Sequence, residues 1–173
     1  MSNVYFISDL HIAHAKVITF ENYYRAGVMG VSTIEEHDNK LYNQIVDNLS
    51  KRDVLFLLGD NGECDAVYKL LKACPARINY IPGNHDKHKA IERWNRLQNI
   101  TIWPPGTYKG YWVTHHPIHP IELYGRKNIH GHVHSKSLKD EQYINLSVEA
   151  TKGMLVPFED IRSGVYTTHN RPF

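Results

Sequence analysis

Histidine, aspartate and asparagine gather in five short segments of this 173-residue sequence, each just after a run of apolar residues. The segments are Asp9-Leu10-His11, Gly59-Asp60, Gly83-Asn84-His85-Asp86, His115-His116 and Gly131-His132-Val133-His134. Imidazole nitrogens and carboxylate oxygens together suit zinc, manganese or iron, whereas calcium prefers oxygen ligands alone and structural zinc usually recruits thiolates. The residue types therefore predict a metalloenzyme.

The spacing inside the segments favours chelation. Asp9 and His11 are two residues apart, so on an extended backbone their side chains point the same way and can hold one ion. His132 and His134 repeat this spacing. A glycine before Asp60, and others before the later segments, allow the backbone to turn tightly and approach a metal or a phosphate closely.

The elements that must position these segments follow from the apolar pattern. Short apolar and β-branched runs bounded by turn residues predict strands at 4–7, 54–58, 78–81, 100–103, 111–114, 127–129, 143–146 and 165–168. Ser32 to Glu35 fits a capping box, and the apolar repeat Leu41, Ile45 and Leu49 has helical spacing, which predicts one long helix. Shorter helices are expected at 66–73 and 87–97.

The order of these elements predicts where the polar segments meet. Strands and helices alternate in the first half of the chain, which is typical of a layered α/β fold. The runs at 4–7 and 54–58 lack polar alternation, so we expect central strands covered on both faces. Because ligands collect beyond the carboxyl ends of parallel strands, Asp9 and Asp60 should share one rim. Neither an internal repeat nor a linker interrupts the sequence, so one domain spanning 1–173 is expected.

Composition excludes several classes of protein. With 42% hydrophobic and 22% charged residues, the chain is an ordinary globular protein and not a disordered or fibrous one. A net charge of +2 without a charge run gives no indication of a nucleic-acid polymer or a membrane surface as partner. The N-terminal residues contain no signal peptide, so a cytoplasmic location is expected. Cys64 and Cys74 lack the spacing of a zinc knuckle or redox motif and are expected to be reduced thiols.

Taken in order, the five segments resemble the motifs of the calcineurin-like metallophosphoesterases. That family reads D-x-H, G-D, G-N-H-[DE], a lone His and G-H-x-H, and all five occur here in the family's order between residues 9 and 134. A single Gly-Asp pair would be weak support, since most proteins contain one. The completeness and order of the set make the resemblance specific.

The resemblance implies a fold and a metal centre. The fold is an α/β four-layer sandwich of two mixed sheets flanked by helices, with two divalent ions about 3.5 Å apart at the strand rim. The implied ligands are Asp9, His11 and His134 for the first ion, Asn84, His115 and His132 for the second, and Asp60 as the bridge. Such a set suits manganese, iron, nickel or zinc comparably.

The resemblance also implies a mechanism. A hydroxide between the ions would attack phosphorus, because two dications lower the pKa of a shared water towards neutrality. His85 is placed by its motif to protonate the departing oxygen, which makes it the general acid.

Two further residues are candidates for substrate contact. His14 extends the first motif to D-x-H-x-x-H, a pattern of a bacterial and phage-like subgroup, where it either faces the substrate or is an exposed histidine at a helix start. Arg25, Arg126 and Lys127 are the cations nearest the motifs, and a guanidinium can grip a phosphate bidentately. Of these, Arg126 is kept as the candidate.

Departures from the family narrow the substrate. In the Ser/Thr protein phosphatases the second motif continues through an Asp-Arg-Gly stretch, whereas here Asp60 is followed by Asn61 and Gly62, which disfavours that activity. The family's DNA-repair nucleases carry long capping segments, for which 173 residues leave no room. The expectation is hydrolysis of a small phosphate monoester or diester, with nucleotides among the candidates. The alternative is an inactive scaffold or binding subunit of the same fold, although such relatives usually lack a ligand or the third-motif histidine.

Overall fold

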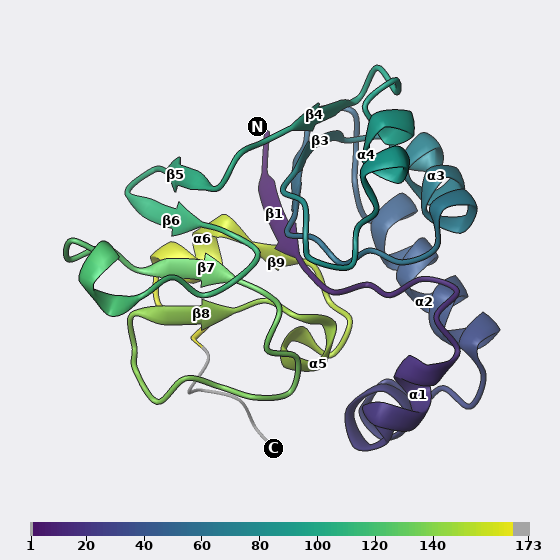
Figure 1. The fold of residues 1–173 in the computed structure, drawn as a ribbon, viewed down its shortest axis with the longest axis horizontal. Coiled ribbons are helices and arrows are strands. Elements are labelled where there is room, and N and C mark those ends of the chain that lie inside the picture. The colour runs from purple at the N-terminus through teal and green to yellow at the C-terminus, as the bar shows by residue number, and fades with distance from the viewer. Residues whose placement is uncertain (1, 168–173) are drawn as a thin grey trace.

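The computed structural model describes residues 2–167, whose strands form two mixed sheets (Figure 1). The first sheet, ordered β4-β3-β2-β1-β9, consists of β1 (Val4–Ile7), β2 (Val54–Leu57), β3 (Arg77–Tyr80), β4 (Ile100–Ile102) and β9 (Val156–Pro157). The second, ordered β5-β6-β7-β8, consists of β5 (Gly106–Tyr108), β6 (Tyr111–Val113), β7 (Asn128–His130) and β8 (Tyr143–Asn145). Strands β1 to β4 are parallel, as are β6 to β8, while β9 and β5 pair antiparallel with β1 and β6. The predicted α/β fold with two mixed sheets is confirmed.

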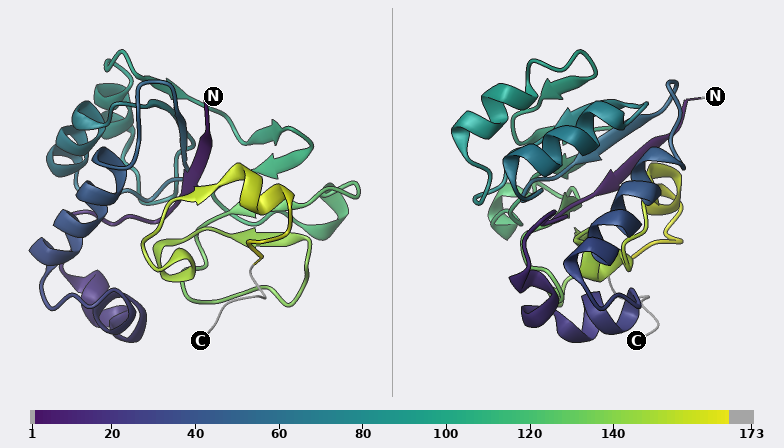
Figure 2. Two further views of the ribbon diagram at one scale, coloured as in Figure 1. Left: turned by 180° about the vertical axis from the view of Figure 1, so that it is seen from behind. Right: turned by 90° about the vertical axis from the view of Figure 1, so that its right-hand side faces the viewer.

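Helices cover the face of the first sheet that points away from the second sheet (Figure 2). They are α2 (Ile34–Val46), α3 (Cys64–Ala73) and α4 (His88–Trp94), and they correspond to the three predicted helices. The remaining helical segments are α1 (Lys16–Phe20), the π-helix η1 (Asn22–Val28), the 3-10 turn η2 (Pro120–Glu122), α5 (Val148–Thr151) and α6 (Phe158–Arg162).

Alternation along β1 and β2 divides the interior into two cores. Ile7 and Leu57 pack against the helices, whereas Phe6 and Phe56 point to the second sheet and stack with ring centroids 4.8 Å apart. Both strands are buried on both faces, as the unbroken apolar runs predicted. Packing on both faces of the first sheet therefore fixes the positions at which β1 and β2 end.

The sheets meet beside the first polar segment. The N–H of Ser8 donates to the carbonyl of Leu146 at 3.0 Å, and the N–H of Val148 donates to the carbonyl of Ser8 at 3.0 Å. These bonds join the end of β1 to the end of β8, so the carboxyl ends of strands from both sheets reach one common edge.

On the outer face of the second sheet lies the segment between β6 and β7, where the Leu123 carbonyl accepts from Trp112 Nε1 at 3.3 Å.

One predicted strand is wrong over its described part. The strand expected at 165–168 is a bend and coil at residues 165–167, and Thr168 lies outside the described residues. Strand β9, which pairs with β1, was not indicated by the sequence. Val165 is 71% exposed, so the β-branched side chain that suggested a strand is not buried in a sheet. No helix among residues 2–167 is long and apolar enough to span a membrane.

Candidate metal centre

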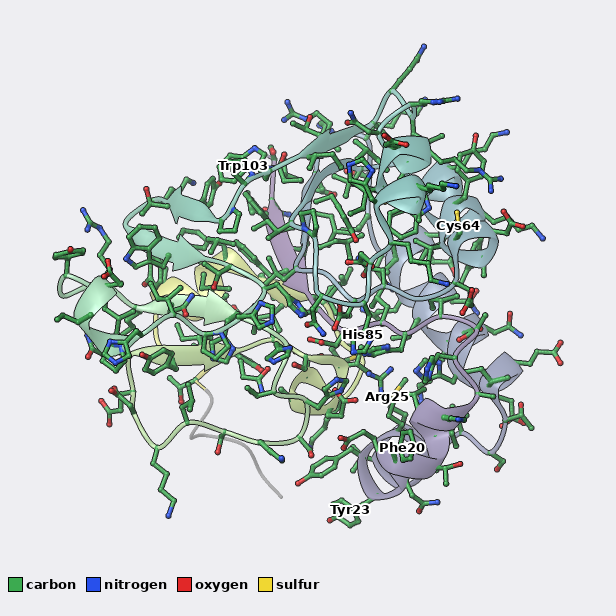
Figure 3. All side chains as sticks on the ribbon, in the orientation of Figure 1. Phe20, Tyr23, Arg25, Cys64, His85 and Trp103 are labelled. Atoms are coloured by element: carbon green, nitrogen blue, oxygen red, sulfur yellow. The ribbon has the colours of Figure 1, made fainter. Side chains whose placement is uncertain are left out.

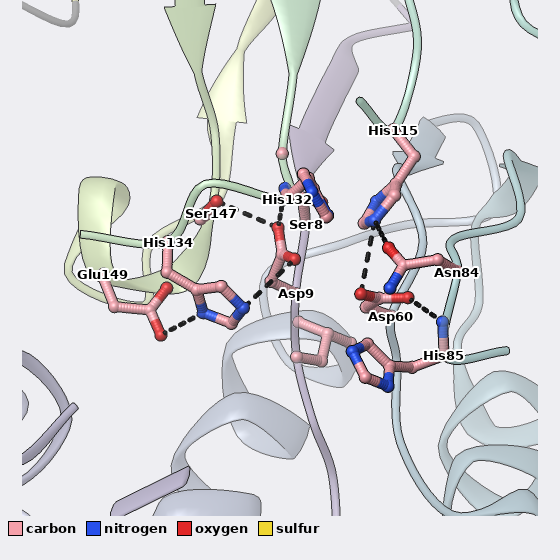
Figure 4. Close-up of polar contacts among 12 residues, drawn as sticks. Ser8, Asp9, Asp60, Asn84, His85, His115, His132, His134, Ser147 and Glu149 are labelled. Carbon is pink, nitrogen blue, oxygen red and sulfur yellow. Dashed lines mark hydrogen bonds and ion pairs between the residues drawn. The ribbon is translucent and has the colours of Figure 1, made fainter. Parts of the chain in front are cut away.

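The five polar segments converge because each follows a parallel strand. Asp9 and His11 follow β1, and Asp60 follows β2. The remaining segments continue the pattern: Asn84 and His85 lie beyond β3, His115 beyond β6, and His132 and His134 beyond β7. Since parallel strands end at the same edge, all seven residues proposed from the sequence as ligands are brought to the line where the two sheets meet. Figure 4 labels all of these residues except His11.

Potential donor atoms in this region form four overlapping groups, and within each group the atoms lie within 4.8 Å of one another. Three groups follow one another along the rim: Asp9–His11–His134, Asp9–Asp60–His115 and His115–His116–His132. The fourth, Glu21–His134–Glu149, joins His134 to two further carboxylates. The three groups along the rim, called the donor chain below, run from His11 and His134 at one end to His116 and His132 at the other, and the carboxylates of Asp9 and Asp60 link the two ends. They are consistent with the two-metal site that the resemblance implies.

Unpartnered atoms show that the donor set fits cations. Asp9 Oδ1, His11 Nε2 and Asp60 Oδ2 are buried and make no hydrogen bond within the described part of the chain. Asp9 Oδ1 is 3.8 Å from His134 Nε2, and Asp60 Oδ2 is 3.3 Å from His115 Nε2. Buried polar atoms are nearly always satisfied, so atoms left open and facing one another indicate a bound ion as the missing partner.

The second oxygen of each carboxylate is fixed by the protein. Asp9 Oδ2 accepts from the N–H of His132 and from Ser147 Oγ, both at 2.9 Å. Asp60 Oδ1 accepts from the N–H of His85 at 2.8 Å. Each carboxylate is thus oriented by one oxygen and offers the other to the cluster.

The hydrogen bonds of His115 define its free nitrogen. Its Nδ1 lies 2.6 Å from the carbonyl of Leu58, and because a carbonyl only accepts, Nδ1 must carry the proton. The Nε2 lone pair of the neutral ring then faces two acceptors, Asn84 Oδ1 at 3.0 Å and Asp60 Oδ2 at 3.3 Å. Three lone pairs directed at one another repel unless a proton or a cation lies among them.

The ring of His134 is oriented by a buried ion pair between Glu149 and Arg25 that the sequence did not predict. His134 Nδ1 donates to Glu149 Oε1 at 3.0 Å, which leaves Nε2 directed at Asp9. Glu149, in α5, also accepts from Arg25 Nε at 2.6 Å, and both side chains are fully buried. The Arg25 guanidinium donates further to the carbonyls of Leu10 at 2.9 Å and Asp9 at 2.5 Å. Arg25 therefore holds the backbone beneath the site, and its role is to position the first segment.

One signal in the sequence could have identified Glu149. Like the five motifs, it comes soon after an apolar strand, here β8, and is separated from it only by Leu146, Ser147 and Val148. Arg25 gives no comparable signal, because its burial on η1 depends on contacts with distant parts of the chain.

Without a metal, electrostatics differ between the proposed ligands: burial raises the pKa of Asp9, whereas hydrogen bonds with Asp60 and Glu149 outweigh burial and raise the pKa values of His115 and His134. Burial and the nearby Arg25 guanidinium lower the pKa of His11 to about 3, so its ring is neutral and its lone pair is available at pH 7. In the absence of a metal, a proton on His115 Nε2 can take the cation's place 3.3 Å from Asp60 Oδ2; burial acts to raise the pKa of Asp60, but this hydrogen bond and the charge of the protonated ring outweigh burial and hold the pKa at about 2. Likewise, Arg25 and His134 overcome the burial of Glu149 and lower its pKa to about 2.

The local backbone differs from the extended geometry expected from the sequence. Asp9, His11, Asp60, His132 and His134 all have positive φ, at 60°, 49°, 53°, 69° and 52°. The expectation of extended segments is therefore wrong. Asp9 and His11 nevertheless share one donor group, as expected, whereas His132 and His134 belong to different groups. Gly131 is needed for another reason, since a Cβ there would overlap Ser8 Oγ and Asp9 Oδ2.

The remaining predicted residues divide between the site and elsewhere. His85 and His14 are exposed, and their rings lie 5.9 and 5.6 Å from that of His11, between centroids. Both line a cavity of about 660 Å³ next to the cluster. Arg126 precedes β7, whereas the histidines follow its carboxyl end, so the structure does not bring Arg126 to the cluster.

Comparisons with known proteins agree with the geometry. A family model described as calcineurin-like phosphoesterase matches residues 2–164. The chain is 29% identical to the Gene 66 protein of Mycobacterium phage D29, over 95% of this chain and 96% of that protein. It is 28% identical to the uncharacterized protein MJ1445 of Methanocaldococcus jannaschii, over 84% of this chain and 77% of that protein.

A solved structure is similar in fold. The protein of unknown function AQ665 from Aquifex aeolicus superposes with a TM-score of 0.69, covering 94% of this chain and 99% of that one. The two sequences are 24% identical, so this likeness concerns the fold alone.

Proposed function

The chain belongs to the calcineurin-like phosphoesterase family, and from that premise we propose that it hydrolyses a small phosphate monoester or diester with the help of two divalent cations. Nucleotides are among the candidate substrates. Manganese, iron, nickel and zinc all suit the donor set of imidazole, carboxylate and amide groups.

In this proposal Asp9, His11 and His134 would hold one ion, Asn84, His115 and His132 would hold the other, and Asp60 would be a ligand of both. Two such cations supply Lewis acidity towards the phosphoryl oxygens and a water of lowered pKa. The open atoms Asp9 Oδ1, His11 Nε2 and Asp60 Oδ2 support this assignment, and they are the observation that carries the proposal.

The protein's own groups then complete the reaction. His85 is exposed to the cavity while its backbone N–H is anchored on Asp60 Oδ1 at 2.8 Å, so its ring stays beside the cluster and can still reach the substrate. We assign it the proton donated to the leaving oxygen. The buried Glu149 and Arg25 keep His134 and the backbone of Asp9 in place during turnover.

A chromogenic assay separates an enzyme from an inactive scaffold. With manganese added, hydrolysis of p-nitrophenyl phosphate or its bis ester is expected to release yellow nitrophenolate. The two esters also separate monoester from diester preference. A protein that binds two ions per chain and turns over neither these esters nor a nucleotide panel with any of the four metals would be a scaffold.

The bridge is tested by Asp60→Asn. An amide bridges two cations poorly, so both ions should bind more weakly and turnover should be lost. Retention of two tightly bound ions in this variant, measured by elemental analysis after gel filtration, would contradict the assignment of Asp60.

A further inference from the structure

A cavity of about 660 Å³ adjoins the metal centre at one end only. His11, His134 and His85 form the side of the cavity next to the cluster, while α1 and the first turns of α3 and α4 form the rest. The described residues that line it do not include His115 or His132, from the other end of the donor chain. The cavity therefore extends from the side of the site where His85 lies.

We infer that this cavity holds the leaving group of the substrate, and that it is built for an uncharged alcohol of nucleoside size with a planar ring. The inference rests on the proposed function, because His85 marks the leaving-group side only if it protonates the departing oxygen. A group bonded to that oxygen has to continue past His85 into the cavity.

Size is the first argument. Small-molecule sites typically measure about 300–1,000 Å³, so this cavity is of the size that encloses a whole ligand. A phosphate group held at the cluster would leave it largely empty. The unused volume lies beyond His85, which predicts that turnover depends strongly on the size of the departing alcohol.

An apolar wall is the second argument. Val17 and Ala90 are buried in the wall of the cavity, and Phe20 lies at its edge with 74% of its surface exposed. Figure 3 shows Phe20 on the helical segment near Tyr23, below His85 in that view. A large aromatic ring that the chain itself leaves uncovered offers a face on which a planar group can stack.

Balanced charge is the third argument. Lys16 and Lys87 contribute two positive charges to the lining, and Glu21 and Glu63 contribute two negative charges. These groups offer hydrogen-bond donors and acceptors without a net attraction for a further anion. The lining therefore suits hydroxyl and amino substituents on a neutral leaving group better than a second phosphate, and nucleosides belong to that chemical class.

The kinetic test compares phenyl phosphate with 2-naphthyl phosphate, whose leaving groups have similar acidity but differ by one ring. We expect kcat/KM to be about tenfold higher for the naphthyl ester. Phe20→Ala should bring this ratio close to one. Tyr23→Ala removes an aromatic ring that is 64% exposed and does not line the cavity, so it serves as the matched control with an unchanged ratio.

Charge selectivity is tested with adenosine monophosphate and diphosphate. Release of terminal phosphate leaves neutral adenosine from the first and anionic adenosine monophosphate from the second. A higher kcat/KM for the monophosphate is expected. A preference for the diphosphate, or equal naphthyl and phenyl rates in the unaltered protein, would overturn the inference.

A binding measurement separates the cavity from the chemistry. Titration of 2-naphthol into the metal-free protein, followed by calorimetry, requires no turnover and should show binding that Phe20→Ala weakens about three- to tenfold. If esters are hydrolysed but naphthol does not bind, the cavity assignment fails and the proposed function stands. If naphthol binds through Phe20 but no ester is hydrolysed, the proposed function fails and the cavity remains a ligand site.

Discussion

Replacing Glu149 by glutamine removes one charge from the interior while preserving the shape of the side chain. Glu149 Oε1 accepts from His134 Nδ1 at 3.0 Å and from Arg25 Nε at 2.6 Å. The amide oxygen of glutamine can accept both bonds. Two changes follow: the His134 ring loses an anionic partner that strengthens its Nε2 as a ligand, and the Arg25 guanidinium becomes a buried charge without compensation.

The first change weakens the binding of one ion, and the second weakens the fold. Loss of the partner behind a ligating histidine typically lowers metal affinity by about 10- to 100-fold, or about 1.4–2.7 kcal/mol. The ion bound by Asp9, His11 and His134 should carry this loss, because Glu149 contacts none of the ligands at the other end of the donor chain. The fold should also lose on the order of 3 kcal/mol for the unpaired guanidinium, which a domain of ordinary stability survives.

The assay is a titration of the metal-free protein with manganese in the presence of a competing chelator, which resolves two binding steps. One step should weaken in Glu149→Gln and the other should remain within about threefold. Glu159→Gln is the matched control, because it makes the same chemical change in an exposed ion pair. Glu159 pairs with Arg162 at 2.6 Å on the surface and belongs to none of the donor groups. The reasoning would be refuted if a folded Glu149→Gln protein bound both ions as tightly as the unaltered protein does. It would also be refuted if Glu159→Gln weakened the same binding step to the same extent.

Three other perturbations address the acid, the packing and the buried charge. His85→Ala should lower kcat by about 10²- to 10⁴-fold with both ions still bound; loss of metal in the same sample would make His85 a ligand instead. Gly131→Ala should destabilise the fold by about 1–3 kcal/mol because its Cβ would overlap Ser8 Oγ, whereas Gly106→Ala meets no atom closer than 3.6 Å, so equal melting temperatures for the two would contradict the packing argument. In the metal-free protein the pKa of Glu149 is about 2, below its ordinary 4.5, so its contribution to stability is complete above pH 4.5 and is lost as the pH falls towards 2. Urea unfolding across this window should show a shallower loss for Glu149→Gln than for the unaltered protein, and parallel curves would exclude the pair as the cause.

The features set by local chemistry were predictable from the sequence. Unbroken apolar runs located β1 and β2, and polar residues placed after strands located the rim at which Asp9, Asp60 and His115 meet. The capping pattern located the start of α2, although the cap is Thr33, whose Oγ1 accepts from the N–H of Glu36 at 3.1 Å. These signals depend on residues that are neighbours in the sequence, so they can be recognised without knowledge of the fold.

The features set by distant contacts were not predictable. Strand β9 has two residues, Val156 and Pro157, which pair with Phe6 and Tyr5 from the other end of the sequence. In the sequence Arg25 cannot be distinguished from other cations, because its partner Glu149 lies 124 positions away. Nor does the sequence mark Phe20 as the rim of a cavity, because the facing wall comes from α3 and α4.

The left-handed backbone at five proposed ligands has a consequence for the evolution and engineering of this chain. A side chain at positive φ costs on the order of 1 kcal/mol relative to glycine, so Asp9, His11, Asp60, His132 and His134 each carry local backbone strain. Hydrogen bonds of the side chain offset this strain at Asp9, Asp60 and His134, whereas the buried Nε2 of His11 makes no hydrogen bond within the described residues. Selection for thermal robustness alone would therefore replace His11 with glycine first, and a heat-screened library needs that codon held constant if its most durable clones are to keep this proposed ligand.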